Sequence, residues 1–197
     1  MPKTNVSAKT LRMTQLAILI ALEAVLTLTP LGFVTIPPIS ITILHIPVIV
    51  GAILLGPMNG AILGGVFGLC SVFRAMMSGN PGDMLFNPAA SGNAFYSLIM
   101  AILPRILLGV IAGYLYILLK KLFKTDYAAL PVTAAVSTIC HTVMVLGLLW
   151  LFFNGVSFSY IFEAIVALNG LVEIGLAVIL VTAICKPLLT VLKKKNG

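Results

Sequence analysis

The chain has 197 residues, of which 60% are hydrophobic and only 9% are charged, and its formal net charge is +7. Soluble domains carry about 25% charged residues, so this composition excludes an ordinary soluble domain and indicates an integral membrane protein. The positive charge does not indicate nucleic-acid binding, because the Lys and Arg residues flank apolar segments and form no stripe with aromatic residues.

Six apolar segments, separated by polar residues, Pro and Gly, predict six transmembrane helices, since a crossing needs about 20 residues. In chain order we expect spans at residues 11–29, 40–55, 59–77, 93–119, 130–153 and 160–184. The first is not expected to be a cleaved signal peptide, because it contains Glu23 and lacks a small-residue cleavage site. The predicted fold class is an all-α bundle of six transmembrane helices, forming one integral-membrane domain over residues 1–197.

The basic residues predict the orientation of this bundle. Ten of the twelve Lys and Arg residues fall into three clusters, namely Lys3, Lys9 and Arg12, then Lys120, Lys121 and Lys124, and finally Lys186 and Lys193 to Lys195. Counting crossings places all three clusters, and the turn at 56–60, on one side. Because cytoplasmic loops are enriched in Lys and Arg, we expect both termini in the cytoplasm and lysines near anionic lipid heads.

The expected outer segments, residues 30–40, 78–92 and 154–159, contain no Lys or Arg. Pro37 and Pro38 exclude a helix through the first of them. In the second, a turn-rich stretch precedes Met84, Leu85 and Phe86. These apolar side chains have two interpretations, either a lid folded over a site or a loop that rests on lipid headgroups.

Small residues recur at spacings typical of helix packing in lipid. Gly60, Gly64 and Gly68 repeat every four residues on the third span, and Gly109 and Gly113 do so on the fourth. Such faces let two helix backbones approach closely, so we expect them to build the bundle. The three cysteines lie singly within apolar runs, which predicts neither a disulfide nor a metal site.

Several polar side chains are expected at membrane depth, where an ionisable residue costs about 2.5–3.5 kcal/mol. At about 1.5 Å per residue, Arg74 and Arg105 lie about 20 Å from the cytoplasmic end. Asn169 and Glu173 reach a similar height on the sixth span, and they share one helix face. Glu23, His45 and His141 lie nearer the midplane.

This convergence in the outer half predicts a binding site that opens to the outside. A guanidinium offers a planar donor fork to a carboxylate, so the expected ligand is a small anion with further hydroxyl or amide groups. The candidate ligand residues are Arg74, Arg105, Asn93, His141, Asn169 and Glu173. Glu23 receives less weight, because it faces a different side of its helix from Ala21.

Structural roles are the alternative for the same residues. Arg105 could pair with Glu173 or Glu23 only to hold the bundle together, and Arg74 could extend to phosphate heads. The two histidines, His45 and His141, could be neutral residues that join helices by hydrogen bonds.

No enzyme signature occurs in the chain. It contains no Walker A loop, nucleophile elbow, His and Glu metal pattern, or pair of membrane aspartates. We therefore expect a protein that is not an enzyme and has no cofactor. A stand-alone secondary transporter is a competing class, although the two halves show no internal repeat. A lipid-modifying membrane enzyme is a third class, disfavoured because no catalytic set is present.

One family resemblance covers nearly the whole chain. It rests on the sequences ITILHIPVIVGA over residues 41–52, LGP over 55–57, GGVFG over 64–68 and LPRILLG over 103–109. With these motifs the chain resembles the substrate-binding S component of an energy-coupling factor (ECF) vitamin transporter. The stretches LHIP at 44–47 and FRA at 73–75 are most similar to pantothenate-specific members. Folate, riboflavin and related S components remain open, because segments like 104–109 also occur in members with other substrates.

The resemblance implies a multi-pass protein of the bacterial cell membrane that captures a vitamin from outside with high affinity. Such S components then topple within the bilayer to release it, driven by a transmembrane scaffold (the T component) and two cytosolic ATPases. The scaffold contact of the family, Ala-x-x-x-Ala, falls on Ala17 and Ala21. Pantothenate is a carboxylate with hydroxyls and an amide, which agrees with the prediction from the arginines.

Overall fold

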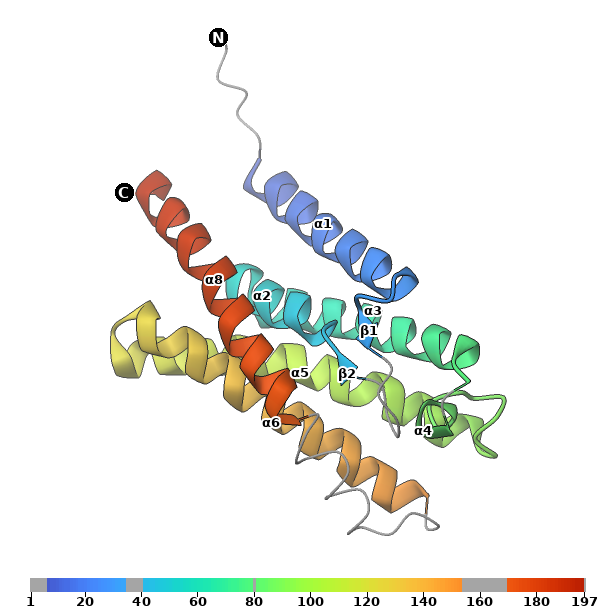
Figure 1. Cartoon of the computed structure of the whole chain (residues 1–197). Coiled ribbons are helices and arrows are strands. Elements are labelled where there is room, and N and C mark those ends of the chain that lie inside the picture. Colours follow the sequence, from blue (N-terminus) through green and yellow to red (C-terminus); the bar gives the residue numbers. More distant parts are fainter. Residues whose placement is uncertain (1–6, 35–40, 80, 154–169, 197) are drawn as a thin grey trace.

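The computed structural model describes residues 7–34, 41–79, 81–153 and 170–196. In these ranges the chain is almost entirely helical (Figure 1). The helices are α1 (Ala8–Leu28), α2 (His45–Leu55), α3 (Pro57–Met77), α4 (Pro81–Met84), α5 (Ala94–Phe123), α6 (Asp126–Phe152) and α8 (Leu171–Asn196).

The prediction of an all-helical membrane protein is confirmed at this level. Among the described residues, five helices are long and apolar enough to cross a membrane by length and composition, namely α1, α3, α5, α6 and α8. The second predicted span corresponds to α2, a shorter apolar helix of 11 residues. The protein is therefore a multi-pass membrane protein.

The second span was predicted too long at its start. Instead of a helix from residue 40, Ile41–Thr42 forms strand β2, which pairs antiparallel with β1 (Phe33–Val34). Pro47 lies in the first turn of α2, and its ring would clash with the carbonyl of Ile43 if the helix extended further back. The apolar run therefore divides into a short strand and a short helix, and no hydropathy criterion detects that division.

The last span was predicted to end too early. α8 continues to Asn196, well beyond the predicted end at residue 184, and it includes Pro187. The apolar run ends where the lysines begin, but a helix can continue past the membrane surface into water. The predicted outer segment at 154–159 and the predicted start of this span at 160–169 lie outside the described residues.

Three helices form the centre of the bundle. α2 is buried over nearly all of its length, and α3 and α5 pack closely against each other. A Cβ added at Gly64 would collide with the carbonyl of Arg105, and one added at Gly109 would collide with the carbonyl of Gly60. The predicted packing role of these glycines is confirmed, since only a residue without a side chain permits this backbone approach.

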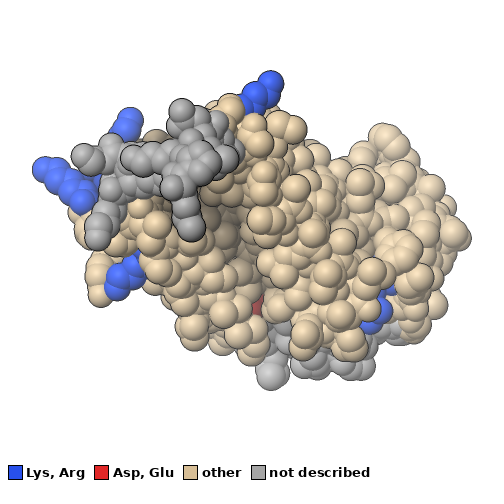
Figure 2. Space-filling model, turned by 90° about the horizontal axis from the view of Figure 1, so that it is seen from above, with Lys and Arg blue, Asp and Glu red and all other residues tan. Residues whose placement is uncertain are grey.

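The ends of the bundle differ in chemistry. In Figure 1 the start of α1, the end of α8, the α2–α3 turn and the α5–α6 connection lie toward the left, whereas α4 lies at the right. Figure 2 shows a face that is mostly uncharged, with Lys and Arg nearer its edges and one small acidic spot near its middle.

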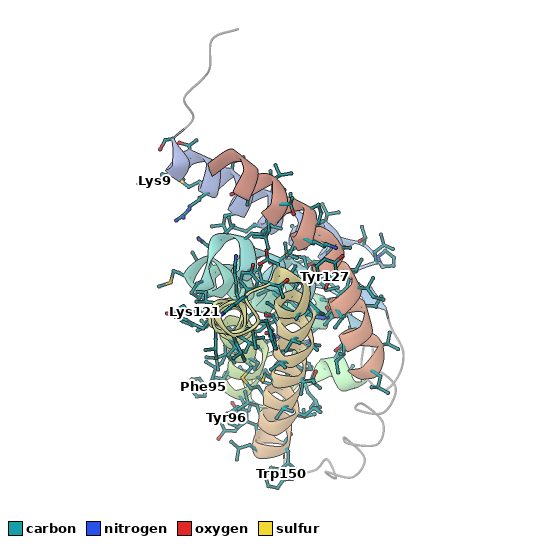
Figure 3. The ribbon with its side chains drawn as sticks, turned by 90° about the vertical axis from the view of Figure 1, so that its left-hand side faces the viewer. Lys9, Phe95, Tyr96, Lys121, Tyr127 and Trp150 are labelled. Atoms are coloured by element: carbon teal, nitrogen blue, oxygen red, sulfur yellow. The ribbon has the colours of Figure 1, made fainter. Side chains whose placement is uncertain are left out.

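Aromatic side chains gather at the end of the bundle where α5 begins and α6 ends. The rings of Tyr96 and Phe152 stack with centroids 4.5 Å apart, and Phe95 and Trp150 are exposed beside them. Figure 3 shows Phe95, Tyr96 and Trp150 at the edge of the molecule. Amphipathic aromatic rings of this kind are enriched at membrane–water boundaries.

Candidate ligand-binding site

The candidate site is centred on Arg105, which α5 carries into the interior of the bundle. Only 6% of this residue is exposed. Its Nη1 donates a hydrogen bond to the carbonyl of Met100, with a distance of 2.7 Å. That carbonyl would normally accept from the N–H of residue 104, but residue 104 is a proline and has no N–H. The guanidinium therefore satisfies the carbonyl that Pro104 leaves without a helical partner.

Two aromatic rings lie against the same guanidinium. Its Cζ is 5.4 Å from the ring centroid of Phe67 on α3 and 5.1 Å from that of Phe86. Phe86 belongs to the loop between α4 and α5, and it is buried. The loop is attached to α5 because the Ser97 hydroxyl donates to the carbonyl of Leu85 at 2.7 Å. Phe86 points inward, as the lid interpretation expects, whereas Met84 is exposed.

The charge of Arg105 is left without an acidic contact. Among the residues that the structure describes, no carboxylate lies within ion-pair distance of it, and its Nε has no hydrogen-bond partner. Glu173 acts on it only as a longer-range opposite charge. A buried guanidinium in this setting can accept the carboxylate of a bound molecule.

Two histidines extend the site across the bundle. The rings of His45 on α2 and His141 on α6 stack with centroids 6.5 Å apart, and His141 is 5.9 Å from Phe67. Both histidines are buried. Within the described part of the chain, neither Nε2 atom has a hydrogen-bond partner.

Two buried hydroxyls on α6 also lack a hydrogen-bond partner in the described part of the chain. Ser137 and Thr138 are buried, and their side-chain oxygens have no partner among residues 7–34, 41–79, 81–153 and 170–196. Ser137 lies one turn before His141 on the same helix face. Buried polar groups are almost always hydrogen-bonded, so a local concentration of unpaired ones indicates a place where a ligand or water supplies the partners.

Glu173 is engaged by the backbone. Its Oε1 accepts a hydrogen bond from the N–H of Thr42 at 2.9 Å, which joins β2 to α8. His45 lies beside the backbone of both residues. Glu173 therefore positions the chain at the edge of the site, and its negative charge acts on Arg105.

The other predicted ligand residues lie away from this centre or cannot be placed. Arg74 is half-buried in the last turn of α3, on the face of Phe67 but seven residues further along. Asn93 is exposed and caps α5, since its Oδ1 accepts from the N–H of Tyr96 at 3.2 Å. Asn169 lies outside the described residues. Their roles as ligand contacts remain predictions.

Sequence reasoning left out several residues that the structure brings to the centre. They are His45, Phe67, Phe86, Ser137 and Thr138. The spacing of Ser137 and His141 on one helix face was a usable signal. Phe86 was considered only as part of a possible lid. Phe67 gave no signal, because phenylalanine at helical spacing is typical of an ordinary core.

A separate surface lies on α1. Ala17 and Ala21 are exposed, while Glu23 on the opposite face is completely buried. The expectation that Glu23 and Ala21 face different sides is confirmed. The two alanines do not pack the interior of the bundle, so they are available to a neighbouring molecule in the membrane.

Comparison with known proteins identifies relatives of the whole chain. Residues 11–186 match the family described as ECF transporter, substrate-specific component. The Pantothenic acid transporter PanT of Lactococcus lactis subsp. cremoris (strain MG1363) is 39% identical over 168 residues. That similarity covers 81% of this chain and 82% of the relative.

Proposed function

This chain belongs to the substrate-specific components of ECF transporters, and we propose that the vitamin it binds is pantothenate. The observation that carries this proposal is the buried guanidinium of Arg105, which has no acidic contact among the described residues and lies beside unpaired polar groups. The 39% identical relative is a pantothenic acid transporter, which supports the same ligand.

The groups of the ligand match the groups of the site. Pantothenate carries one carboxylate, one amide and two hydroxyls. We assign the carboxylate to Arg105, and we assign the hydroxyl and amide groups to Ser137, Thr138 and His141, whose polar atoms need partners. Arg74, Asn93, Asn169 and Glu173 are secondary candidates around the outer end.

The loop that carries Phe86 would act as a cover on the outer side. Its ring lies 5.1 Å from the Arg105 guanidinium and keeps water from the charge. Because water is kept away, a carboxylate binds this guanidinium more strongly than it would bind an exposed one. High affinity for a small anion is the expected result.

The proposed arrangement in the membrane has six spans with both termini in the cytoplasm. The confinement of Lys and Arg to one side of the predicted topology supports it. We further propose that the partners are an ECF transmembrane scaffold (T component) and two cytosolic ATPases, since the chain has no Walker A loop of its own. The exposed alanines Ala17 and Ala21 are the proposed scaffold contact.

Isothermal titration of the purified protein, without ATP, tests the ligand assignment against pantothenate, folate and riboflavin. We expect one pantothenate per chain. Arg105→Ala should lower the affinity for pantothenate at least about 30-fold, because removing one partner of a buried charge pair costs about 2–5 kcal/mol. Lys121→Ala is the matched control, since this exposed lysine lies at the other end of α5. Unchanged pantothenate affinity in Arg105→Ala would contradict the role of Arg105. Binding of folate or riboflavin in place of pantothenate would change the identity of the proposed vitamin.

Folding is checked separately, because Arg105 also satisfies the carbonyl of Met100. Ser137→Ala removes one buried hydroxyl without affecting that hydrogen bond. This variant should also lower the affinity for pantothenate. Pantothenate uptake by proteoliposomes that contain this chain alone, driven by an ion gradient, would instead favour a stand-alone transporter.

A further inference from the structure

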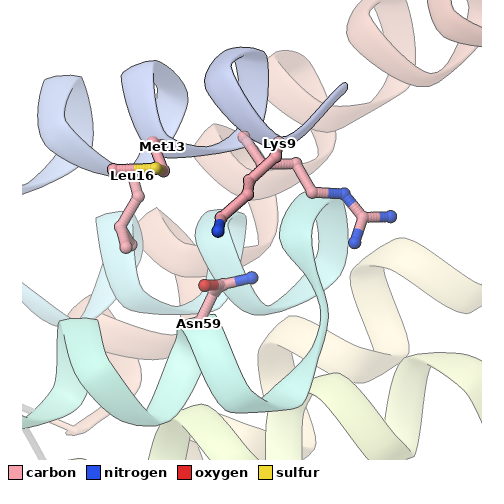
Figure 4. A pocket seen from close by; sticks show the side chains of 5 residues that line it. Lys9, Met13, Leu16 and Asn59 are labelled. Atoms are coloured by element: carbon pink, nitrogen blue, oxygen red, sulfur yellow. The ribbon is translucent and has the colours of Figure 1, made fainter. Parts of the chain in front are cut away.

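A cavity of about 340 Å³ lies between α1 and α3, at the end of the bundle where α1 begins and α8 ends. Its lining residues are Lys9, Arg12, Met13, Leu16 and Asn59. Figure 4 shows Lys9 extending from α1 toward Asn59 on α3. None of these residues belongs to the candidate pantothenate site, which lies around Arg105.

The two cations that line this cavity make no ion pair in the described structure that would stabilise the fold. Lys9 and Arg12 lie in the first two turns of α1, which has no acidic residue in its first turn. Neither has an ion pair with any residue of the described ranges. Because the helix dipole is positive at its N-terminus, two cations there are unfavourable unless an anion binds beside them.

The polar floor of the cavity is held in a defined position. The Asn59 side chain donates from Nδ2 to the carbonyl of Leu55 at 2.8 Å. An amide group has a second Nδ2 hydrogen and an acceptor oxygen, so it can still bind a ligand. Asn59 lies in the first turn of α3, just after the Gly56 turn, at the end of the membrane-spanning part of that helix.

The walls continue as apolar surface along both helices. Met13 is exposed on α1, where it lines the cavity with Leu16, and Met58 and Ile62 are exposed on α3. The cavity therefore combines a cationic end with an apolar continuation toward the middle of the span. This distribution fits an amphipathic anion with a charged head and hydrocarbon chains, and it fits a free inorganic anion less well.

We propose that this cavity binds the phosphate headgroup of an anionic phospholipid. Lys9 and Arg12 contact the phosphate, Asn59 bonds to the polar region of the head, and the acyl chains follow Met13 and Leu16. Basic pockets between helices on the cytoplasmic side of a membrane are suited to such heads. With the proposed orientation, the lipid belongs to the cytoplasmic leaflet, and it connects α1 to α3.

Lipid addition to the detergent-purified protein tests this site. Phosphatidylglycerol is the anionic probe and phosphatidylcholine the zwitterionic one, and native mass spectrometry counts retained lipids while a thermal scan reports Tm. We expect phosphatidylglycerol alone to be retained and to raise Tm, since a ligand that binds only the folded state stabilises it. Equal retention of both lipids would overturn the proposal. An equal rise in Tm with inorganic phosphate would overturn it as well, because the site would then bind a free anion.

Matched double variants locate the binding. Lys9→Gln with Arg12→Gln should weaken phosphatidylglycerol binding about 30-fold, since each basic residue near the surface contributes about fivefold. Lys121→Gln with Lys124→Gln removes the same charge from exposed lysines outside the cavity, and it should leave the affinity unchanged. Equal losses in both double variants would show a diffuse charge effect and overturn the site.

A further variant covers the case in which the first double variant does not fold. Asn59→Asp places a negative charge in the cavity and should also reduce phosphatidylglycerol binding. Pantothenate titrations with the same samples should be unaffected, so failure of the lipid site and failure of the vitamin assignment give different results. Normal lipid binding, with loss of association with the ECF scaffold in the first double variant, would assign the cavity to a protein partner and overturn the lipid proposal.

Discussion

At the residue scale, the most informative pair is Pro104 and Arg105. Proline removes a backbone donor inside α5, and the guanidinium of the next residue satisfies the carbonyl left behind at Met100. The two residues therefore compensate each other locally. This contact also holds the guanidinium inside the bundle, beside Phe67 and Phe86, without neutralising its charge. The pairing with Glu173 or Glu23 that was considered for Arg105 does not occur among the described residues. The hydrogen bond to Met100 anchors the side chain instead, and it is compatible with ligand binding.

Glu23 is expected to lower the stability of the fold, because its carboxyl group is buried without a partner in the described structure. It is fully buried on α1, and both carboxyl oxygens lack a hydrogen-bond partner within the described ranges. We expect Glu23→Leu to stabilise the protein by about 1–3 kcal/mol, because an unpaired buried polar group carries a penalty of that size. For a chain of this length the corresponding rise in Tm is about 2–10 °C in a thermal scan.

Glu173→Leu is the control for this prediction. Here the carboxylate does have a partner, since it accepts from the N–H of Thr42, so its removal should lower Tm. A fall in Tm for Glu23→Leu as well would mean that Glu23 has a stabilising partner in the complete protein.

At the element scale, the contact between α3 and α5 positions the site, because α3 supplies Phe67 and α5 supplies Arg105. This contact depends on glycine. At Gly64 an added Cβ would meet the backbone of Arg105 and Ile106, which cannot move as a flexible side chain would. The helix pair therefore tolerates no side chain at this position.

We expect Gly64→Ala to destabilise the protein by about 1–3 kcal/mol, the usual cost of overpacking. It should also lower the affinity for pantothenate, because Arg105 must shift. The neighbouring Gly65→Ala is the control. Its added Cβ would have only Ile106 Cγ1 nearby, at 3.9 Å, and alanine favours the helix by about 0.8–1 kcal/mol over glycine. Thermal scans and titrations on both variants check this, and equal behaviour of the two would contradict the packing argument.

At the scale of the whole molecule, the proposed vitamin site and the proposed scaffold contact lie in different parts of this chain. The polar cluster that would hold a vitamin is inside the bundle, between α2, α3, α5 and α6. The alanines of α1 are on its outside. Binding and coupling to a scaffold should therefore be separable by mutation.

Ala17→Trp or Ala21→Trp should leave pantothenate affinity unchanged and stop uptake in the complete ECF complex, because an indole prevents close helix contact. Ile179→Trp adds similar bulk to an exposed position on α8 and should permit uptake. Titration of the isolated chain and uptake by proteoliposomes with the full complex are the two measurements. Loss of vitamin binding in the alanine variants would show that these residues support the bundle itself.

The sequence alone was sufficient for the membrane class, the approximate spans, the family and the presence of a cation at Arg105 inside the bundle, whose role as a ligand contact stays a prediction. These properties depend on local composition and on short motifs, since about 20 apolar residues must cross a bilayer and a buried cation is rare. The same reasoning assigned the small-residue faces correctly, because a spacing of four residues repeats on one side of a helix. Its errors were at the ends of spans, where hydropathy does not distinguish a strand from a helix at residues 41–42, nor a membrane segment from its continuation in water.

The membership of the site was decided by tertiary structure. Phe86 lies in the loop after α4, His45 begins a short buried helix, and Ser137 lies on α6, yet all contribute to one polar and aromatic centre. Asn93 was predicted as a secondary partner of the ligand. Its side chain caps the helix that it precedes, and its role as a ligand contact stays a prediction. Depth along a helix can be counted from sequence, whereas the direction in which a side chain points depends on how the helices rotate and pack against one another.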